Sequence, residues 1–313
     1  MAVATAATAC YAARSPAGPG RPSTRPAHVL FAYVPAGSAD GVLKVLDRRS
    51  GRFVERRPRT PGLLAAPVPS PDGAYLAVPD NTGRVALMST VDGRTSWVAT
   101  GREVKAVAWS ADSRTLAGLA GRVGPKGAVV TVDVRSRTTS TVAVVPPGNG
   151  LLPTTALFGP DGKSLVVAYA GVGARAGSAN RVAFYSAGGR LIRSIPAAGT
   201  PIGSHPWSPS GAELIVLGDP AREGGPPQIL SVATSDGRVV GRFAVRGQPV
   251  GWLDESHVVV TKTQGSAGAL ESVKPDGSDA RMLISLPSDV TVPATVFLAP
   301  AEGLPAGALR YAF

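Results

Sequence analysis

The chain has 313 residues, 44% of them hydrophobic, which suits either two average domains or one repeat-built domain with a tail. Lys and Arg number 32 against 21 Asp and Glu, a net charge of +11, but no nucleic-acid-reading motif accompanies this charge, so nucleic-acid binding is not expected. The single Cys10 excludes an internal disulfide and a cysteine-based zinc site, and no apolar run is long enough to cross a membrane.

Residues 1–27 form a separate segment, Ala-rich at first and then rich in Pro, Gly and Arg, as in a disordered tether. The opening resembles part of a secretory signal but lacks its basic start and its strong hydrophobic stretch. Three interpretations remain open: an exported protein with a clipped or misplaced start, a weak signal as it stands, and a cytoplasmic tail. We expect one folded domain over residues 28–313.

The folded part begins with a predicted strand over residues 28–34 and a hairpin over residues 41–56 that turns near Gly51. From residue 68 onward a unit repeats. Each unit has a short strand, a turn of the Pro-Asp-Gly type and a second, almost wholly apolar strand, as expected for a strand buried between neighbouring sheets. Aligned on the residue before the turn and the one seven positions later, the copies are Pro69 to Leu76, Trp109 to Leu116, Phe158 to Leu165, Trp207 to Leu214 and, in degenerate form, Trp252 to Val259.

Each unit continues with a third and a fourth strand around another tight turn. These outer hairpins turn near Gly51, Gly93, Ser136, Gly189, Gly237 and Gly277. Successive units begin 40, 49, 49 and 45 residues apart, a period typical of a propeller. The chain starts partway through a unit and ends with leftover strands over residues 291–300 and 308–313, one strand more than six blades need.

We therefore predict an all-β, six-bladed propeller of four-stranded antiparallel blades, with seven blades as the alternative. C-terminal strands would close the ring by joining the N-terminal blade. The unit resembles the WD40-like repeat of TolB-type six-bladed β-propellers, best at Trp109-Ser110 and Trp207-Ser208-Pro209. The resemblance covers residues 28–313 and implies a binding or scaffold module of the bacterial cell envelope, exported and without a cofactor.

The recurring motif residues are expected to shape turns and to pack neighbouring blades. Because the same residue types return in every unit, a turn explains the Asp and Gly residues better than a ligand site does. The Trp residues occupy equivalent positions and predict packing between blades. The motif residues are Asp72, Gly73, Trp109, Asp112, Asp161, Gly162, Trp207, Gly211 and Trp252.

Catalytic and metal motifs are absent from the sequence, which has no H-E-x-x-H, no G-x-S-x-G elbow and no dinucleotide fingerprint. His205, on a predicted inner strand, is the one weak catalytic candidate, and it supports an alternative function as a lactonase- or lyase-type propeller enzyme. A cytoplasmic interaction platform is a further alternative. No metal site and no cofactor are predicted.

Three long loops are expected on the rim opposite the tight turns, over residues 120–127, 171–180 and 218–227. Loops of this kind carry function more often than the elements they connect. Their basic residues and the arginines that flank them predict a surface for an acidic protein or polymer, bound by a monomeric propeller. The predicted binding residues are Arg84, Arg122, Lys126, Arg175, Arg181 and Arg222.

Overall fold

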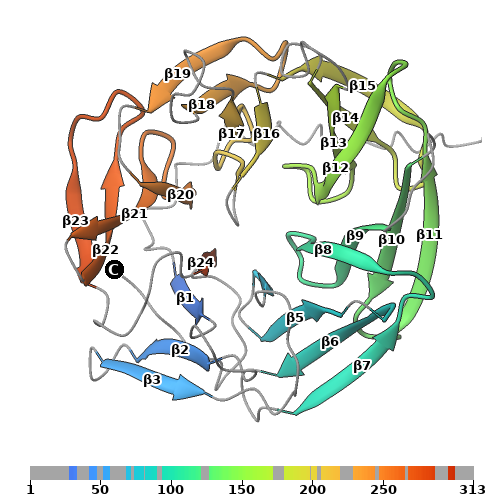
Figure 1. Cartoon of the computed structure of the whole chain (residues 1–313), viewed down its shortest axis with the longest axis horizontal. Coiled ribbons are helices and arrows are strands. Elements are labelled where there is room, and N and C mark those ends of the chain that lie inside the picture. Colours follow the sequence, from blue (N-terminus) through green and yellow to red (C-terminus); the bar gives the residue numbers. More distant parts are fainter. Residues whose placement is uncertain are drawn as a thin grey trace, which may run out of the picture.

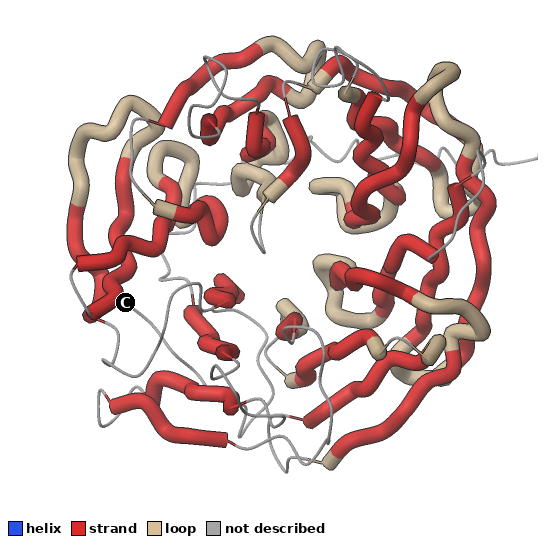
Figure 2. Tube along the Cα trace, in the orientation of Figure 1, coloured by secondary structure: helices blue, strands red, loops and turns tan. Residues whose placement is uncertain are grey.

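The computed structural model describes residues 28–33, 42–47, 52–56, 68–71, 74–80, 82–89, 94–120, 127–171, 180–197, 199–202, 206–218, 228–243, 247–264, 267–285 and 295–299. Every regular element in these ranges is a β-strand, and the strands are arranged in a ring (Figures 1 and 2). The expectation of an all-β propeller with four-stranded antiparallel sheets is confirmed.

Five blades are each built from four strands that follow one another in the sequence. Blade I contains β4 (Val68–Pro69), β5 (Tyr75–Pro79), β6 (Arg84–Ser89) and β7 (Thr95–Ala99). Blade II contains β8 (Val104–Trp109), β9 (Thr115–Ala120), β10 (Gly127–Asp133) and β11 (Thr138–Val144). Blade III contains β12 (Leu151–Phe158), β13 (Leu165–Gly171), β14 (Arg181–Tyr185) and β15 (Leu191–Pro196).

Blade IV contains β16 (Gly199–Pro201), β17 (Glu213–Gly218), β18 (Gln228–Ala233) and β19 (Val239–Phe243). Blade V contains β20 (Gln248–Trp252), β21 (Val258–Gln264), β22 (Ala267–Val273) and β23 (Arg281–Ser285). The remaining strands form a composite sheet from the two ends of the chain, in the order β24 (Thr295–Ala299), β1 (His28–Tyr33), β2 (Val42–Asp47) and β3 (Arg52–Arg56).

The predicted blade count needs correction. The structure has five blades of consecutive strands, not six or seven, and one composite sheet whose side chains lie outside the described residues. The composite sheet joins the two ends of the chain through β24, which pairs with β1 from His28 opposite Ala299 to Ala32 opposite Thr295. Residues 308–313 lie outside the described residues. The physical reason for the composite sheet is that an unpaired inner edge on β1 would leave backbone groups unsatisfied.

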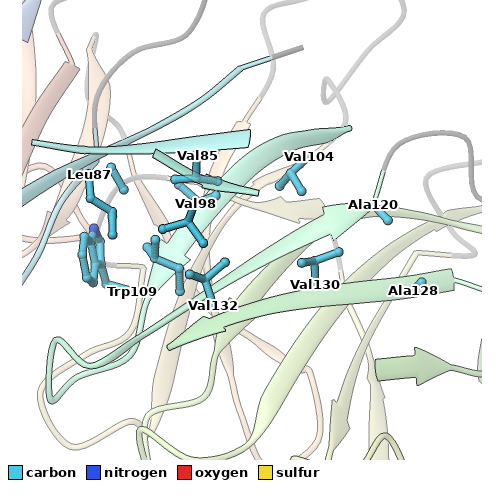
Figure 3. Close-up of a cluster of buried hydrophobic side chains, with 12 residues drawn as sticks. Val85, Leu87, Val98, Val104, Trp109, Ala120, Ala128, Val130 and Val132 are labelled. Carbon is cyan, nitrogen blue, oxygen red and sulfur yellow. The ribbon is translucent and has the colours of Figure 1, made fainter. Parts of the chain in front are cut away.

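Burial falls from the second strand of a blade to the fourth. In blade II, β9 is buried over Leu116–Ala120, whereas β11 is exposed over Thr138–Thr141. The core is accordingly a series of apolar layers, each shared by two neighbouring blades. Figure 3 shows the layer between blades I and II, in which Val85 and Leu87 of one blade face Trp109 and Val132 of the next. No blade buries its apolar faces alone.

In blades I, II and IV, the turn that opens the second strand is closed by a serine. Ser110 Oγ accepts a hydrogen bond from the Thr115 amide at 2.9 Å and donates to Asp112 Oδ1 at 2.6 Å. Ser70 and Ser208 accept the same bond from the amide five residues later, at 2.9 and 3.1 Å. The Ser and Asp of the repeated motif therefore satisfy backbone donors of the turn.

The tryptophans of the repeat bind the preceding blade. Trp109 Nε1 donates to the carbonyl oxygen of Val68 in blade I at 2.8 Å. Trp207 Nε1 donates to Phe158 in blade III at 2.9 Å, and Trp252 Nε1 donates to Pro206 in blade IV at 3.2 Å. Each indole ring is buried in the layer between its own blade and the previous one, so one side chain supplies both apolar contact and a directional bond.

Two turn glycines of blade IV also lie against the preceding blade. Gly211 of blade IV has φ +73°, and a Cβ there would overlap the Pro160 ring of blade III. Gly237, in the outer turn of blade IV, has φ +79°, and its Cβ would overlap the Pro196 carbonyl oxygen of blade III. Both positions thus require glycine for the left-handed backbone and for the close approach of the two blades.

Removing β24 should disrupt the ring. Deletion of residues 291–313 takes away the partner of β1 and exposes an unpaired edge, so we expect aggregation or loss of cooperative thermal unfolding. Deletion of residues 300–313 leaves β24 in place and is the matched control, expected to unfold as the full chain does. Equal melting of the two truncated chains, followed by circular dichroism, would contradict closure through β24.

The indole bond between blades I and II should contribute measurably to stability. Trp109→Phe keeps an aromatic ring but leaves the Val68 carbonyl without its donor, so we expect the free energy of unfolding to fall by about 2 kcal/mol. Trp97→Phe, at a position that is 40% exposed, is the control and should cost less than about 1 kcal/mol. Both values follow from urea unfolding monitored by circular dichroism.

Candidate functional site

The alternation of strands divides the connections between two rims. The turns within the first and second pairs of strands in each blade lie on one side, named here the tight-turn rim. The connections from second to third strands, and from one blade to the next, lie on the other side, the long-loop rim. The strand ends that flank the connections from β9 to β10, from β13 to β14 and from β17 to β18 therefore lie on the long-loop rim, and these flanking residues show how it is held.

Arg84 begins β6 on the long-loop rim and is held by its neighbours. Its Nε donates to Asp80 Oδ2 at 2.9 Å, and its guanidinium lies 4.4 Å from the centre of the Trp97 ring. Burial raises the pKa of Asp80, but the hydrogen bonds from Thr82 and Arg84 outweigh it, and the pKa lies below its ordinary value. Half of the Arg84 side chain stays exposed, so a charge of fixed position faces solvent.

Arg181 occupies the equivalent position in blade III, as the first residue of β14, and is exposed. The preceding residue, Asn180, is buried, and its Oδ1 accepts a hydrogen bond from the Gly171 amide at 3.3 Å. Asn180 also accepts a bond from the Ala197 amide through its backbone oxygen, at 3.0 Å. These contacts fix both ends of the connection over residues 172–179, and Arg181 stands at its base.

The structure places two of the six predicted binding residues, Arg84 and Arg181, on the same rim in blades I and III. The other four lie outside the described residues: Arg122, Lys126, Arg175 and Arg222. His205, on which the enzyme alternative depends, lies outside them too, as do Asp72 and Gly73 of the motif. The remaining motif residues have the turn and inter-blade positions given above.

A histidine that the sequence did not single out joins two turns of blade V. His257 Nδ1 lies 3.0 Å from Asp254 Oδ1 in the inner turn, and its Nε2 lies 3.1 Å from Asp279 Oδ2 in the outer turn. Ionised carboxylates only accept hydrogen bonds, so both contacts are hydrogen bonds when both ring nitrogens carry protons. The group also includes Arg281, whose NH2 lies 2.9 Å from Asp279 Oδ1, and Lys274, whose Nζ lies 3.7 Å from Asp279 Oδ2.

The two carboxylates of this group are stabilised as anions for different reasons. The hydrogen bonds with His257 and Arg281 lower the pKa of Asp279 from its ordinary value. At Asp254, burial opposes ionisation, but bonds from Ser256 and His257 lower the pKa in total. The signal in the sequence was the degenerate turn itself. Trp252 pairs with Val258, six positions later, whereas the corresponding pairs in blades I to IV are seven positions apart, so this turn is one residue shorter.

The tight-turn rim also carries arginines, one just after each outer turn in blades I to V. All are exposed: Arg94, Arg137, Arg190, Arg238 and Arg281. Turn carboxylates stand beside several of them, as Asp236 Oδ1 does when it accepts the Arg238 amide at 2.9 Å. Positive and negative charges are therefore interspersed on this rim, which makes it a matched control surface for the long-loop rim.

The described part of the chain has neither a metal-binding cluster nor a membrane-spanning helix. It contains no group of three or more His, Cys, Asp or Glu side chains arranged to hold a metal ion. It also contains no helix long and apolar enough to span a membrane.

The comparisons with known proteins place this fold among solved β-propellers. No protein-family model and no curated protein matches the sequence. TolB from Acinetobacter baumannii aligns with a TM-score of 0.59 at 18% identity, covering 88% of this chain and 67% of that one. The Cps50 (Swd1) β-propeller domain from Myceliophteria thermophila aligns at 0.53 with 14% identity, covering 85% and 89%. A putative TolB from Agrobacterium tumefaciens aligns at 0.52 with 17% identity, covering 83% and 90%.

The turn aspartates should make the fold sensitive to acid. Burial raises the pKa of Asp161. Hydrogen bonds from Ser164 and Lys163 lower it by more than burial raises it, so the pKa of Asp161 lies below the ordinary 3.8. Because the folded pKa lies below the unfolded one, the carboxylate stabilises the fold above about pH 4 and loses that contribution as the pH falls through the folded value.

Asp161→Asn should therefore lower the free energy of unfolding at neutral pH by about 1 kcal/mol and flatten its fall in acid. Asp236→Asn is the control, because, among the described residues, the Arg238 amide is the one group that donates to the Asp236 carboxylate. Urea unfolding at neutral and acidic pH measures both effects. An unchanged acid dependence in Asp161→Asn would show that this carboxylate does not help to stabilise the turn.

The TolB and Cps50 structures compared above are all less than 20% identical to this chain, so their similarity shows the fold alone. The chain folds as a β-propeller of the kind seen in TolB structures.

Proposed function

We propose that the protein is a non-enzymatic binding scaffold that holds an acidic face of a partner protein on its long-loop rim. The residues proposed to bind are those predicted above, of which Arg84 and Arg181 are described. An arginine at an interface supplies several donors in a fixed plane that match carboxylate geometry, so a rim of arginines favours an acidic partner.

The observation that carries this proposal is the way Arg84 is held. Its guanidinium is fixed by Asp80 and by the Trp97 ring, yet half of the side chain faces solvent. A charge whose position is already fixed loses little conformational freedom when a partner binds. Arg181, at the base of its own loop, occupies the equivalent place two blades away.

We also propose that the protein is exported and acts in the bacterial cell envelope, as a monomer whose propeller covers residues 28–313. The support for this location is the resemblance of the repeat to TolB-type propellers and the likeness of the fold to two structures titled TolB or putative TolB. The alternative location is the cytoplasm. Cell fractionation with an antibody against the propeller distinguishes the two.

Charge reversal on the long-loop rim should weaken binding to an acidic polypeptide. With poly-L-glutamate as the probe, Arg175, Arg181 and Arg222 together changed to Glu should weaken binding by about 2 kcal/mol, roughly thirtyfold in Kd. Binding by the unchanged protein should weaken steeply as salt is raised, because the attraction is summed over several exposed charges.

The control changes Arg94, Arg190 and Arg238 on the tight-turn rim to Glu, which gives the same change in net charge. Melting temperature checks that both triple variants fold. Equal loss of binding in both would mean that only total charge matters and would refute a role for the long-loop rim. Unchanged binding in the long-loop variant would refute it as well.

A further inference from the structure

The connector over residues 145–150, which joins β11 of blade II to β12 of blade III, lies on the long-loop rim between two basic loops. Val144, at its start, pairs with Gly127, which follows the loop over residues 121–126. Leu151, at its end, pairs with Gly171, which precedes the loop over residues 172–179. A charge placed on this connector therefore stands between the bases of both loops.

Within this connector, Asn149 is followed by Gly150, and both are exposed. Gly150 has φ +69°, and no atom lies within 4 Å of where its Cβ would be. Among the described residues, none forms a hydrogen bond with the Asn149 carboxamide or with the Gly150 amide. Among the described residues, therefore, no side chain shields the amide nitrogen of Gly150 and no acceptor holds it in a hydrogen bond.

We infer that Asn149 is a modification site at which asparagine converts spontaneously to aspartate and isoaspartate. The deprotonated Gly150 nitrogen attacks the side-chain carbonyl carbon of Asn149. A new C–N bond closes a five-membered succinimide, the bond to the side-chain nitrogen breaks, and ammonia leaves with the proton taken from the amide. Water then adds to either carbonyl of the ring and opens it to aspartate or isoaspartate, with no oxidant or reductant consumed.

The product adds one negative charge between Gly127 and Gly171, which flank the two connections that carry predicted binding residues. Isoaspartate also lengthens the main chain of the connector, whose first residue is held in place by a hydrogen bond from Tyr185 Oη to the Val145 carbonyl oxygen at 2.6 Å. The effect of the modification on binding rests on the proposed function, whereas the modification itself does not. As Asn149 converts to aspartate and isoaspartate, the protein would bind an acidic partner progressively less well.

Asn180 is the matched internal control. It is buried, its Oδ1 accepts the Gly171 amide, and the next residue, Arg181, carries a side chain that shields its own nitrogen. The intact protein is incubated in mildly alkaline buffer at body temperature, digested, and assayed by mass spectrometry for conversion at both positions. We expect conversion at Asn149 at close to the rate of a synthetic peptide spanning residues 143–153, and none at Asn180.

Two variants test the chemistry. Gly150→Ala places a methyl group beside the attacking nitrogen and should slow conversion about tenfold, and Asn149→Gln, which would need a larger ring, should stop it. Protection of Asn149 in the folded protein by more than about tenfold relative to the peptide would overturn the inference, since the native connector would then hold the nitrogen away from the carboxamide. Conversion in Gly150→Ala at the unchanged rate would overturn it too.

A separate measurement isolates the consequence for binding. Asn149→Asp introduces the charge at once and should weaken the interaction with poly-L-glutamate if the long-loop rim binds it. Equal affinity of Asn149→Asp and the unchanged protein would count against the proposed rim, and mass spectrometry would still decide the modification.

Discussion

The contact on which the ring depends is that between each blade and the one before it. A blade buries its apolar faces only against its neighbours, so the ring needs a way to fix the distance and angle between consecutive sheets. Tryptophan supplies this in blades II, IV and V, where the buried indole donates to a carbonyl oxygen of the preceding blade. Glycine lets the turns of the next blade approach closely enough for that bond to form.

This contact explains why the repeated residues gather on one rim. Ser, Asp and Gly close the turn, and the same turn lies against the previous blade, so little can change there without disturbing two blades. The connections on the opposite rim are longer in several blades, and surface loops of this kind tolerate changes of length and charge. The proposed binding surface lies on this long-loop rim, where Arg84 and Arg181 begin the third strands of their blades.

Blade V departs from the pattern in a way that the physics of the turn accounts for. Leu253 follows Trp252, so this turn lacks the serine hydroxyl that accepts an amide hydrogen bond in blades I, II and IV. Asp254 replaces it, accepting the amides of Ser256 and His257 at 2.7 and 2.8 Å. In the shortened turn, His257 lies within hydrogen-bond distance of Asp279 in the outer turn. This side-chain contact joins the inner and outer turns of blade V.

The propeller fold could be predicted from the sequence because the Trp-Ser-Pro-Asp-Gly pattern combines two local signals. Its turn residues have local backbone preferences, and the composition of its apolar strands indicates that they are buried. The sequence also located the long connections, since turn signals mark where strands end. The number of blades and the closure of the ring depend on contacts between distant segments. The pairing of β24 with β1 joins residues more than 260 positions apart, and no local pattern gives its register.

The contacts of individual side chains were likewise decided by the tertiary structure. Nothing near Trp109 in the sequence points to the carbonyl oxygen of Val68, and nothing near His257 points to Asp279, because both pairs come together only when separate hairpins pack. The same reason holds for Asn149: the Asn-Gly pair is visible in the sequence, but its free amide and its place between two basic loops follow from how blades II and III are joined. Local preference fixes the elements, and packing fixes which side chains meet.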